Sequence, residues 1–223
     1  MTLTNTAYNF KIELKENVVY VLDIENKIAY REILNDIRNQ VNGEYGNFIL
    51  SDVDKEKTIS KEVDCVFNLF ELECNDKRIL NKIYQEIKQM ANENMLEEMS
   101  EINIYLINFL EKVIGKVPYN LDYDCELDIS DILKMYNVRV DIQEESLQEK
   151  LVNYIKIMHQ VCHVNIFMFA NLKQFFSVGE LMQIYEAAFY EKVILITVES
   201  MYLSKIDVEK YVIIDENLCI IEL

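Results

Sequence analysis

The sequence is poor in glycine, proline and basic residues, and it contains no tryptophan. Its 223 residues include 4 glycines and 1 proline, whereas 51% are hydrophobic. This composition excludes collagen-like and low-complexity chains and supplies enough apolar surface for a folded core. Lysine and arginine together number 22 against 39 acidic residues, so the formal net charge is −17. Taken alone, this charge argues against binding to a nucleic-acid backbone, which requires Lys and Arg at the phosphates.

Long apolar runs are also missing. No segment reaches the roughly 18 uninterrupted apolar residues of a membrane helix, and residues 1–14 carry charges where a signal peptide needs its apolar stretch. We therefore expect a cytoplasmic protein with no membrane partner. The five cysteines never form a C-x-x-C pair, so neither a disulfide framework nor a zinc knuckle is indicated. We expect the thiols to be reduced and mostly buried.

The hydrophobic pattern predicts an α/β body. Helices are expected at 27–41, 129–135, 146–159 and 178–190. Strands are expected at 7–14, 17–24, 47–52, 63–72, 138–142, 164–170, 192–200 and 211–223. Strands that alternate with helices of this length are typical of parallel sheets, and the runs at 164–170 and 192–200 are apolar on both faces, as buried parallel strands are. The expected fold is a mostly parallel sheet flanked by helices.

A helical insertion interrupts this body. Residues 76–116 have apolar positions at helical spacing, and a break near 92–94 divides the stretch into two helices. We therefore assign 1–72 and 119–223 to an α/β head domain and 73–118 to a helical leg domain.

The usual signatures of nucleotide-binding and hydrolytic enzymes are absent from the sequence. The four glycines form neither G-x-G-x-x-G nor a P-loop, and no G-x-S-x-G elbow occurs. The first strand-to-helix turn, residues 23–27, reads DIENK and lacks the glycines that let a backbone wrap a phosphate. We expect no catalytic residues and no enzyme activity.

An acidic stretch before the short helix carries the strongest chemical pattern. Carboxylates recur there at every second position, at Asp122, Asp124, Glu126 and Asp128. In an extended segment this period places all four on one face, and hard oxygen ligands of this kind suit calcium. The alternative is a solvated acidic loop in which the last carboxylate caps the following helix. Further carboxylates that could contribute are Asp141, Glu144 and Glu145.

Two small groups of basic residues stand out in so acidic a chain. Lys55, Lys57 and Lys61 cluster in the polar segment 54–61, and Arg31 and Arg38 lie seven residues apart, on one face of the first expected helix. Their grouping would gain meaning in a symmetric oligomer, where one copy becomes several around an axis. The simpler alternative is a solvated charged face.

Three stretches resemble the Csn-two family, the CRISPR-associated adaptation proteins of type II-A systems. They are LDYDCELDISDILKMYNVRVDIQEESLQEKLVNYIKIMHQV, NIFMFANLKQFFSVGELMQIYEAAFYEKVILITVES and YVIIDENLCII. In the first hundred residues the likeness rests on element order and on LSDVDKEKTISKEVDCVFNLFELECNDKRILNKIYQEI.

The resemblance implies a head with a degenerate P-loop ATPase-like core that does not hydrolyse ATP, together with a helical leg. It also implies a homotetrameric ring, stabilised by calcium, whose inner lysines contact double-stranded DNA threaded from a free end. The stretch from Asp122 to Asp128 falls where family calcium ligands cluster, and Lys55, Lys57 and Lys61 fall near the junction of head and leg. The resemblance thus makes these lysines candidates for contacts with DNA phosphates, with Arg31 and Arg38 as further candidates. The expected partners are linear duplex DNA and the other adaptation proteins, an integrase and an RNA-guided nuclease. Two alternatives stay open, namely a protein–protein scaffold and a degenerate nucleotide-binding regulator.

Overall fold

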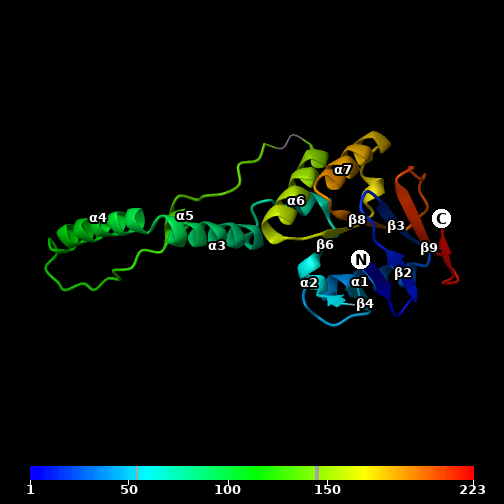
Figure 1. The fold of residues 1–223 in the computed structure, drawn as a ribbon, viewed down its shortest axis with the longest axis horizontal. Coiled ribbons are helices and arrows are strands. Elements are labelled where there is room, and N and C mark those ends of the chain that lie inside the picture. The colour runs from blue at the N-terminus through cyan, green and yellow to red at the C-terminus, as the bar shows by residue number, and fades with distance from the viewer. Residues whose placement is uncertain (54, 144–145) are drawn as a thin grey trace. The chain divides into compact units, whose positions relative to one another are not determined.

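The computed structural model describes residues 1–53, 55–143 and 146–223 (Figure 1). Its contacts divide the chain into a head unit, Met1–Cys74 with Ile142–Leu223, and a leg unit, Asn75–Asp141. The leg unit is longer than the leg domain expected at 73–118, because the chain after the second long helix returns to the first. There the Tyr84 hydroxyl donates to the carbonyl of Val138 at 2.7 Å.

A six-stranded sheet forms the centre of the head unit. Its strand order is β10-β9-β3-β8-β7-β6, and every neighbouring pair is parallel except β9 and β10. The strands are β3 (Val19–Ile24), β6 (Val63–Val66), β7 (Ile166–Ala170), β8 (Ile194–Glu199), β9 (Glu209–Ile214) and β10 (Ile220–Glu222). Every residue of β3, β7 and β8 is buried. This confirms the expected mostly parallel α/β sheet.

Helices cover this sheet and meet it through apolar stripes. The helices of the head unit are α1 (Lys27–Val41), α2 (Ile59–Glu62), α6 (Leu147–Cys162) and α7 (Val178–Tyr190), with 3-10 turns η1 (Leu69–Glu71) and η2 (Leu172–Gln174). Ala29, Ile33 and Ile37 of α1 recur at helical spacing and are buried. Both α6 and α7 begin with a capping box, in which Ser146 and Ser177 cap their first turns.

A second sheet of the head unit is antiparallel, with strand order β2-β1-β4-β5. Its strands are β1 (Thr2–Asn5), β2 (Phe10–Glu13), β4 (Phe48–Asp52) and β5 (Lys55–Lys57). β2 alternates buried and exposed residues, as expected when one face packs on a core. Leu3, Phe10 and Phe48 join the hydrophobic cluster that contains α1 and the parallel strands, so the two sheets share one core.

A buried ion pair lies against the parallel sheet. The Lys173 ammonium lies 2.7 Å from Glu209 and donates to the Tyr211 hydroxyl at 2.6 Å. The Tyr185 hydroxyl donates to the other Glu209 oxygen at 2.8 Å. Burial, followed by the charge of Glu209, raises the pKa of Tyr185, so it is a neutral donor. These bonds join η2, β9 and α7.

The leg unit contains three helices, α3 (Lys77–Asn94), α4 (Leu96–Ile114) and α5 (Ile129–Met135). α3 packs against both α4 and α5. The strand expected at 138–142 was a wrong prediction, because no neighbouring strand completes it. Side chains of α3 and its N-terminal flank bond that backbone instead, and Asn75 both accepts from the Val140 N–H at 2.8 Å and donates to its carbonyl at 3.0 Å.

Two further expectations concern the cysteines and the membrane. Cys74 is buried, but Cys125 and Cys219 are exposed and Cys65 and Cys162 are intermediate, so the expectation of mostly buried thiols was wrong. Within the described ranges, no helix is both long and apolar enough to cross a membrane.

Replacing Lys173 by Met tests the buried ion pair. The substitution leaves Glu209 buried without its counter-charge, and we expect a loss of about 3–5 kcal/mol in the free energy of unfolding. Lys156→Met, at an exposed position of α6, is the matched control and should change it by less than about 0.5 kcal/mol. Chemical denaturation measures both. Equal stability of the two variants would contradict the assigned role of Lys173.

Candidate functional site

The lysines predicted to contact DNA lie on a short connection of the head unit. Lys55 and Lys57 are the first and last residues of β5, which pairs antiparallel with β4. Lys61 lies in α2, the single turn that leads into β6. Lys55 and Lys61 are exposed. Residue 54, which begins the basic segment in the sequence, lies outside the described residues.

Helix α1 carries the other two predicted cations and contacts α2. Arg31 and Arg38 are both exposed, and seven residues separate them by about 10 Å along the helix axis. Arg38 lies in the last turn, where a positive charge is favoured by the helix dipole.

A shallow pocket lies between the C-terminal end of α1 and the β5–α2 segment. Its volume is about 320 Å³, and its lining includes Gln40, Glu44, Glu56 and Lys57. The structure therefore brings Lys57 close to the end of α1. The Lys57 ammonium also lies 3.5 Å from Glu62, which partly neutralises it.

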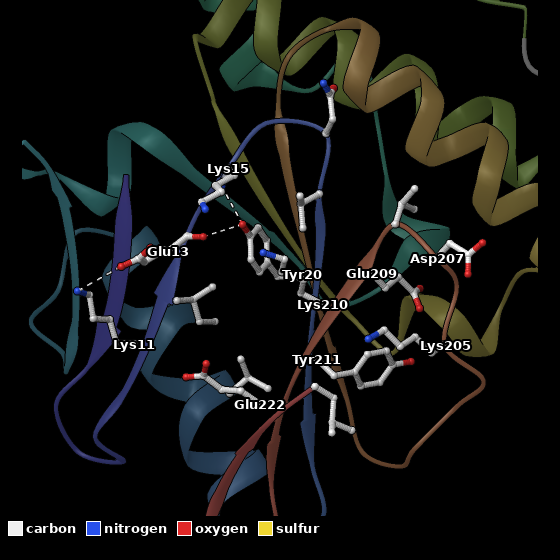
Figure 2. A pocket seen from close by; sticks show the side chains of 16 residues that line it. Lys11, Glu13, Lys15, Tyr20, Lys205, Asp207, Glu209, Lys210, Tyr211 and Glu222 are labelled. Carbon is white, nitrogen blue, oxygen red and sulfur yellow. Dashed lines mark hydrogen bonds and ion pairs between the residues drawn. The ribbon is translucent and has the colours of Figure 1, made fainter.

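A larger groove lies between the two sheets of the head unit, along β2 and β9 (Figure 2). Its volume is about 840 Å³, and four lysines line it, namely Lys11, Lys15, Lys205 and Lys210. Sequence reasoning missed them because they come in pairs almost two hundred residues apart. Carboxylates share the groove, among them Glu13, Asp207 and Glu222, so it has little excess positive charge.

The acidic stretch is an irregular segment of the leg unit, between α4 and α5. Its backbone follows α4, where the Asn103 amide donates to the Cys125 carbonyl at 2.8 Å. Asp122, Asp124 and Glu126 are exposed.

Asp128 is engaged within the leg unit. Its carboxylate caps α5 by accepting from the Ser130 N–H at 2.9 Å and lies 2.6 Å from the Lys88 ammonium. The Lys88 bond is the main cause that lowers the pKa of Asp128 to about 2, and the bonds from Ser130 add to it.

The four predicted calcium ligands do not form a metal site within one chain. Over residues 1–53, 55–143 and 146–223, no group of three or more His, Cys, Asp and Glu side chains is placed to hold a metal ion. A depression of about 690 Å³ borders Asp124, Glu126 and Asp128, but Lys88 also lines it and supplies the positive charge there. Glu144 and Glu145, suggested as extra ligands, lie outside the described residues.

Comparison with known proteins decides the family. The family described as CRISPR-associated protein (Cas_Csn2) matches residues 40–218 of this chain. The chain belongs to the Cas_Csn2 family. This match, over most of the chain, confirms the resemblance drawn from the sequence.

A curated relative agrees with this membership. A CRISPR-associated protein Csn2 of Streptococcus agalactiae is 24% identical over 141 residues. The match covers 60% of this chain and 61% of the relative, so the chain spans less than two thirds of that protein's length.

The solved structures to which this chain is similar include ATP-binding cassettes. One, an ATP-binding cassette of an ABC transporter in its ADP conformation, has a TM-score of 0.47 and 11% identity, with 96% of this chain and 82% of that chain covered. A putative ABC transporter ATP-binding protein from Pyrococcus furiosus has a TM-score of 0.41 and 10% identity, with coverage of 95% and 97%.

The contact between Lys88 and Asp128 gives a pH prediction for the leg unit. Because the folded pKa lies below the ordinary 3.8, the carboxylate contributes stability above about pH 4 and loses that contribution as the pH falls toward 2. We expect Lys88→Met to raise the pKa of Asp128 toward its ordinary value, as measured by NMR titration. Lys134→Met, which removes a surface pair with Asp131, is the control and should leave it unchanged. An unchanged pKa in Lys88→Met would contradict the assignment.

Proposed function

We propose that this Cas_Csn2 protein is a non-catalytic binder of double-stranded DNA ends that supports spacer acquisition in type II-A CRISPR adaptation. Membership of the family supports the adaptation role. The observation that carries DNA binding is a set of exposed cations in the head unit without acidic partners.

Four of the five predicted cations are free to meet phosphates. Lys55, Lys61, Arg31 and Arg38 are exposed, and none forms an ion pair with another described residue. Unpaired cations create a local positive potential even on an acidic protein, because salt screens charges beyond about 8 Å at physiological ionic strength. Contacts of this type go to the DNA backbone, so binding should be independent of sequence and strongly dependent on salt.

Charge-reversal variants test whether duplex binding depends on this set of cations or on the lysines of the larger groove. We expect Lys55→Glu with Lys61→Glu to weaken duplex binding about ten- to a hundredfold at 0.15 M salt, and to reduce the salt slope by about 0.9 for each lost phosphate contact. Lys11→Glu with Lys15→Glu changes the net charge by the same amount where carboxylates already balance lysines, and should have little effect. A gel-shift titration measures both. Equal losses in the two variants would indicate a non-specific effect of net charge.

The same titration tests the preference for ends and the role of calcium. Linear duplex should shift, whereas the same sequence as a closed circle should not, because a ring threads DNA only from a free end. Calcium dependence stays a prediction, since one chain does not assemble the four carboxylates into a site. The gel-shift titration is therefore carried out both with calcium and with a chelator. Absence of any shift would overturn the DNA proposal and leave a scaffold or a nucleotide-linked regulator as the better account.

The leg unit supports self-association into the proposed homotetramer. α4 is 19 residues long and none of them is buried within the chain. Apolar residues recur along it and its N-cap in alternating steps of four and three, the spacing of a coiled-coil seam. They are Met95, Met99, Ile102, Leu106, Phe109 and Val113. A second copy of the same helix would cover this seam, as the two-fold interfaces of homo-oligomers commonly do.

Substitution on the seam tests this assembly. We expect Phe109→Glu to convert the tetramer into a smaller species, as measured by light scattering after gel filtration, because a charge in the seam opposes its burial. Ile104→Glu is the matched control. Ile104 is exposed on the same helix, but it lies about 200° around the axis from Ile102, and its variant should assemble normally. A Phe109→Glu variant of unchanged size would exclude α4 as the interface.

The integrase and the RNA-guided nuclease of the same system are the proposed protein partners. Adaptation joins capture of a DNA end to its integration, so a protein that holds the end must pass it to the enzyme that cuts or joins it. We propose that the protein itself contributes no catalytic residue to those steps.

A further inference from the structure

Two carboxylates of the head unit lie side by side in the parallel sheet. Asp23 of β3 and Glu199 of β8 are register partners, and each is 0% exposed. Neighbouring strands are about 4.8 Å apart, and register partners project from the same face of a sheet. The two side chains therefore lie next to each other, close to the C-terminal ends of their strands.

Most of the oxygens of this pair have no partner. Neither oxygen of Asp23 accepts a hydrogen bond from a described residue, nor does Glu199 Oε2. Only Glu199 Oε1 is satisfied, by the Thr197 hydroxyl and by the backbone N–H of Lys173. Buried polar groups in folded proteins are nearly always paired, so three unpaired carboxylate oxygens together indicate a missing ligand.

No described cation forms an ion pair with either carboxylate. Lys173 is the buried cation on this face, and it pairs with Glu209. Tyr185 and Tyr211 stay neutral, because burial raises the pKa of both. Neither Asp23 nor Glu199 therefore has an ion-pair partner among the described residues. Burial of unpaired carboxylates is strongly unfavourable, whereas one ion of charge +2 would neutralise the pair.

A phosphate group does not fit this place. The N-terminus of α1, which follows β3, is closed by its own N-cap, because the Asn26 side chain accepts from the N–H groups of Ile28 and Ala29. Asp23 and Glu25 flank that turn and would repel an anion. The turn that follows β3 is thus flanked by carboxylates and is unsuited to an anion.

We propose that Asp23 and Glu199 bind one hard divalent cation, Mg²⁺ or Ca²⁺, at the C-terminal edge of the parallel sheet. Such ions take carboxylate and neutral oxygens, and Mg²⁺ is commonly held by one or two carboxylates with waters. Tyr30, in the first turn of α1, offers a buried hydroxyl without a hydrogen-bond partner. The ion would tie β3 to β8 and stabilise the head unit. This site is independent of the acidic stretch, which belongs to the leg unit.

Thermal unfolding of the chelator-treated protein, with Mg²⁺ alone or Ca²⁺ alone, tests the site. At a hundredfold excess over the dissociation constant, the midpoint should rise by roughly 5–10 °C. Asp23→Asn and Glu199→Gln are nearly isosteric. Each should reduce this rise, and each should raise the midpoint of the metal-free protein because it removes a buried charge.

A control variant and a count of the bound ions complete the test. Asp122→Asn with Asp124→Asn removes carboxylates of the acidic stretch and should retain the rise. Calorimetric titration should count one ion fewer in Asp23→Asn than in the natural protein. Two results would overturn the proposal. One is a midpoint that responds to neither ion; the other is a response and an ion count that are identical in Asp23→Asn and Glu199→Gln.

Discussion

The head unit depends on the complete burial of β3. This strand lies between two parallel neighbours, β8 and β9, and all six of its residues are buried. On one face its apolar residues join the core shared by α1 and both sheets. Asp23 occupies the same buried strand and is 0% exposed, so its surroundings must compensate the carboxylate. The central position of β3 in the sheet therefore accounts both for the burial of its apolar residues and for the burial of the Asp23 carboxylate.

Charge is the second constraint on this protein. With 39 acidic residues against 22 basic ones, cations are scarce, and some of them pair with carboxylates. Lys173 is committed to a buried pair, Lys88 to the cap of α5, and Lys57 in part to Glu62. The four cations proposed to contact DNA phosphates are exposed and form no ion pair with another described residue. They lie on α1 and on the β5–α2 segment of the head unit.

Sequence periodicity predicted most of the fold, because the faces of a helix or strand that are buried determine the spacing of its apolar residues. The uninterrupted apolar runs at 164–170 and 192–200 became β7 and β8, which are buried on both faces. The break near 92–94 separates α3 from α4, as expected. The prediction failed at 138–142, where an alternating pattern forms no strand. A strand needs a neighbour for its backbone groups, and here the side chains of Asn75 and Tyr84 take that place.

The sequence alone determined the α/β class and the helical insertion, because these follow from local periodicity and from the order of elements. The family was indicated by the resemblance of the quoted stretches. The tertiary structure decided which charges meet. Carboxylates at every second position of a free segment are not gathered into a site, whereas Asp23 and Glu199, 176 positions apart, become register partners. The physical reason is that strand pairing brings distant residues to within about 5 Å, and no local pattern records which strands will pair.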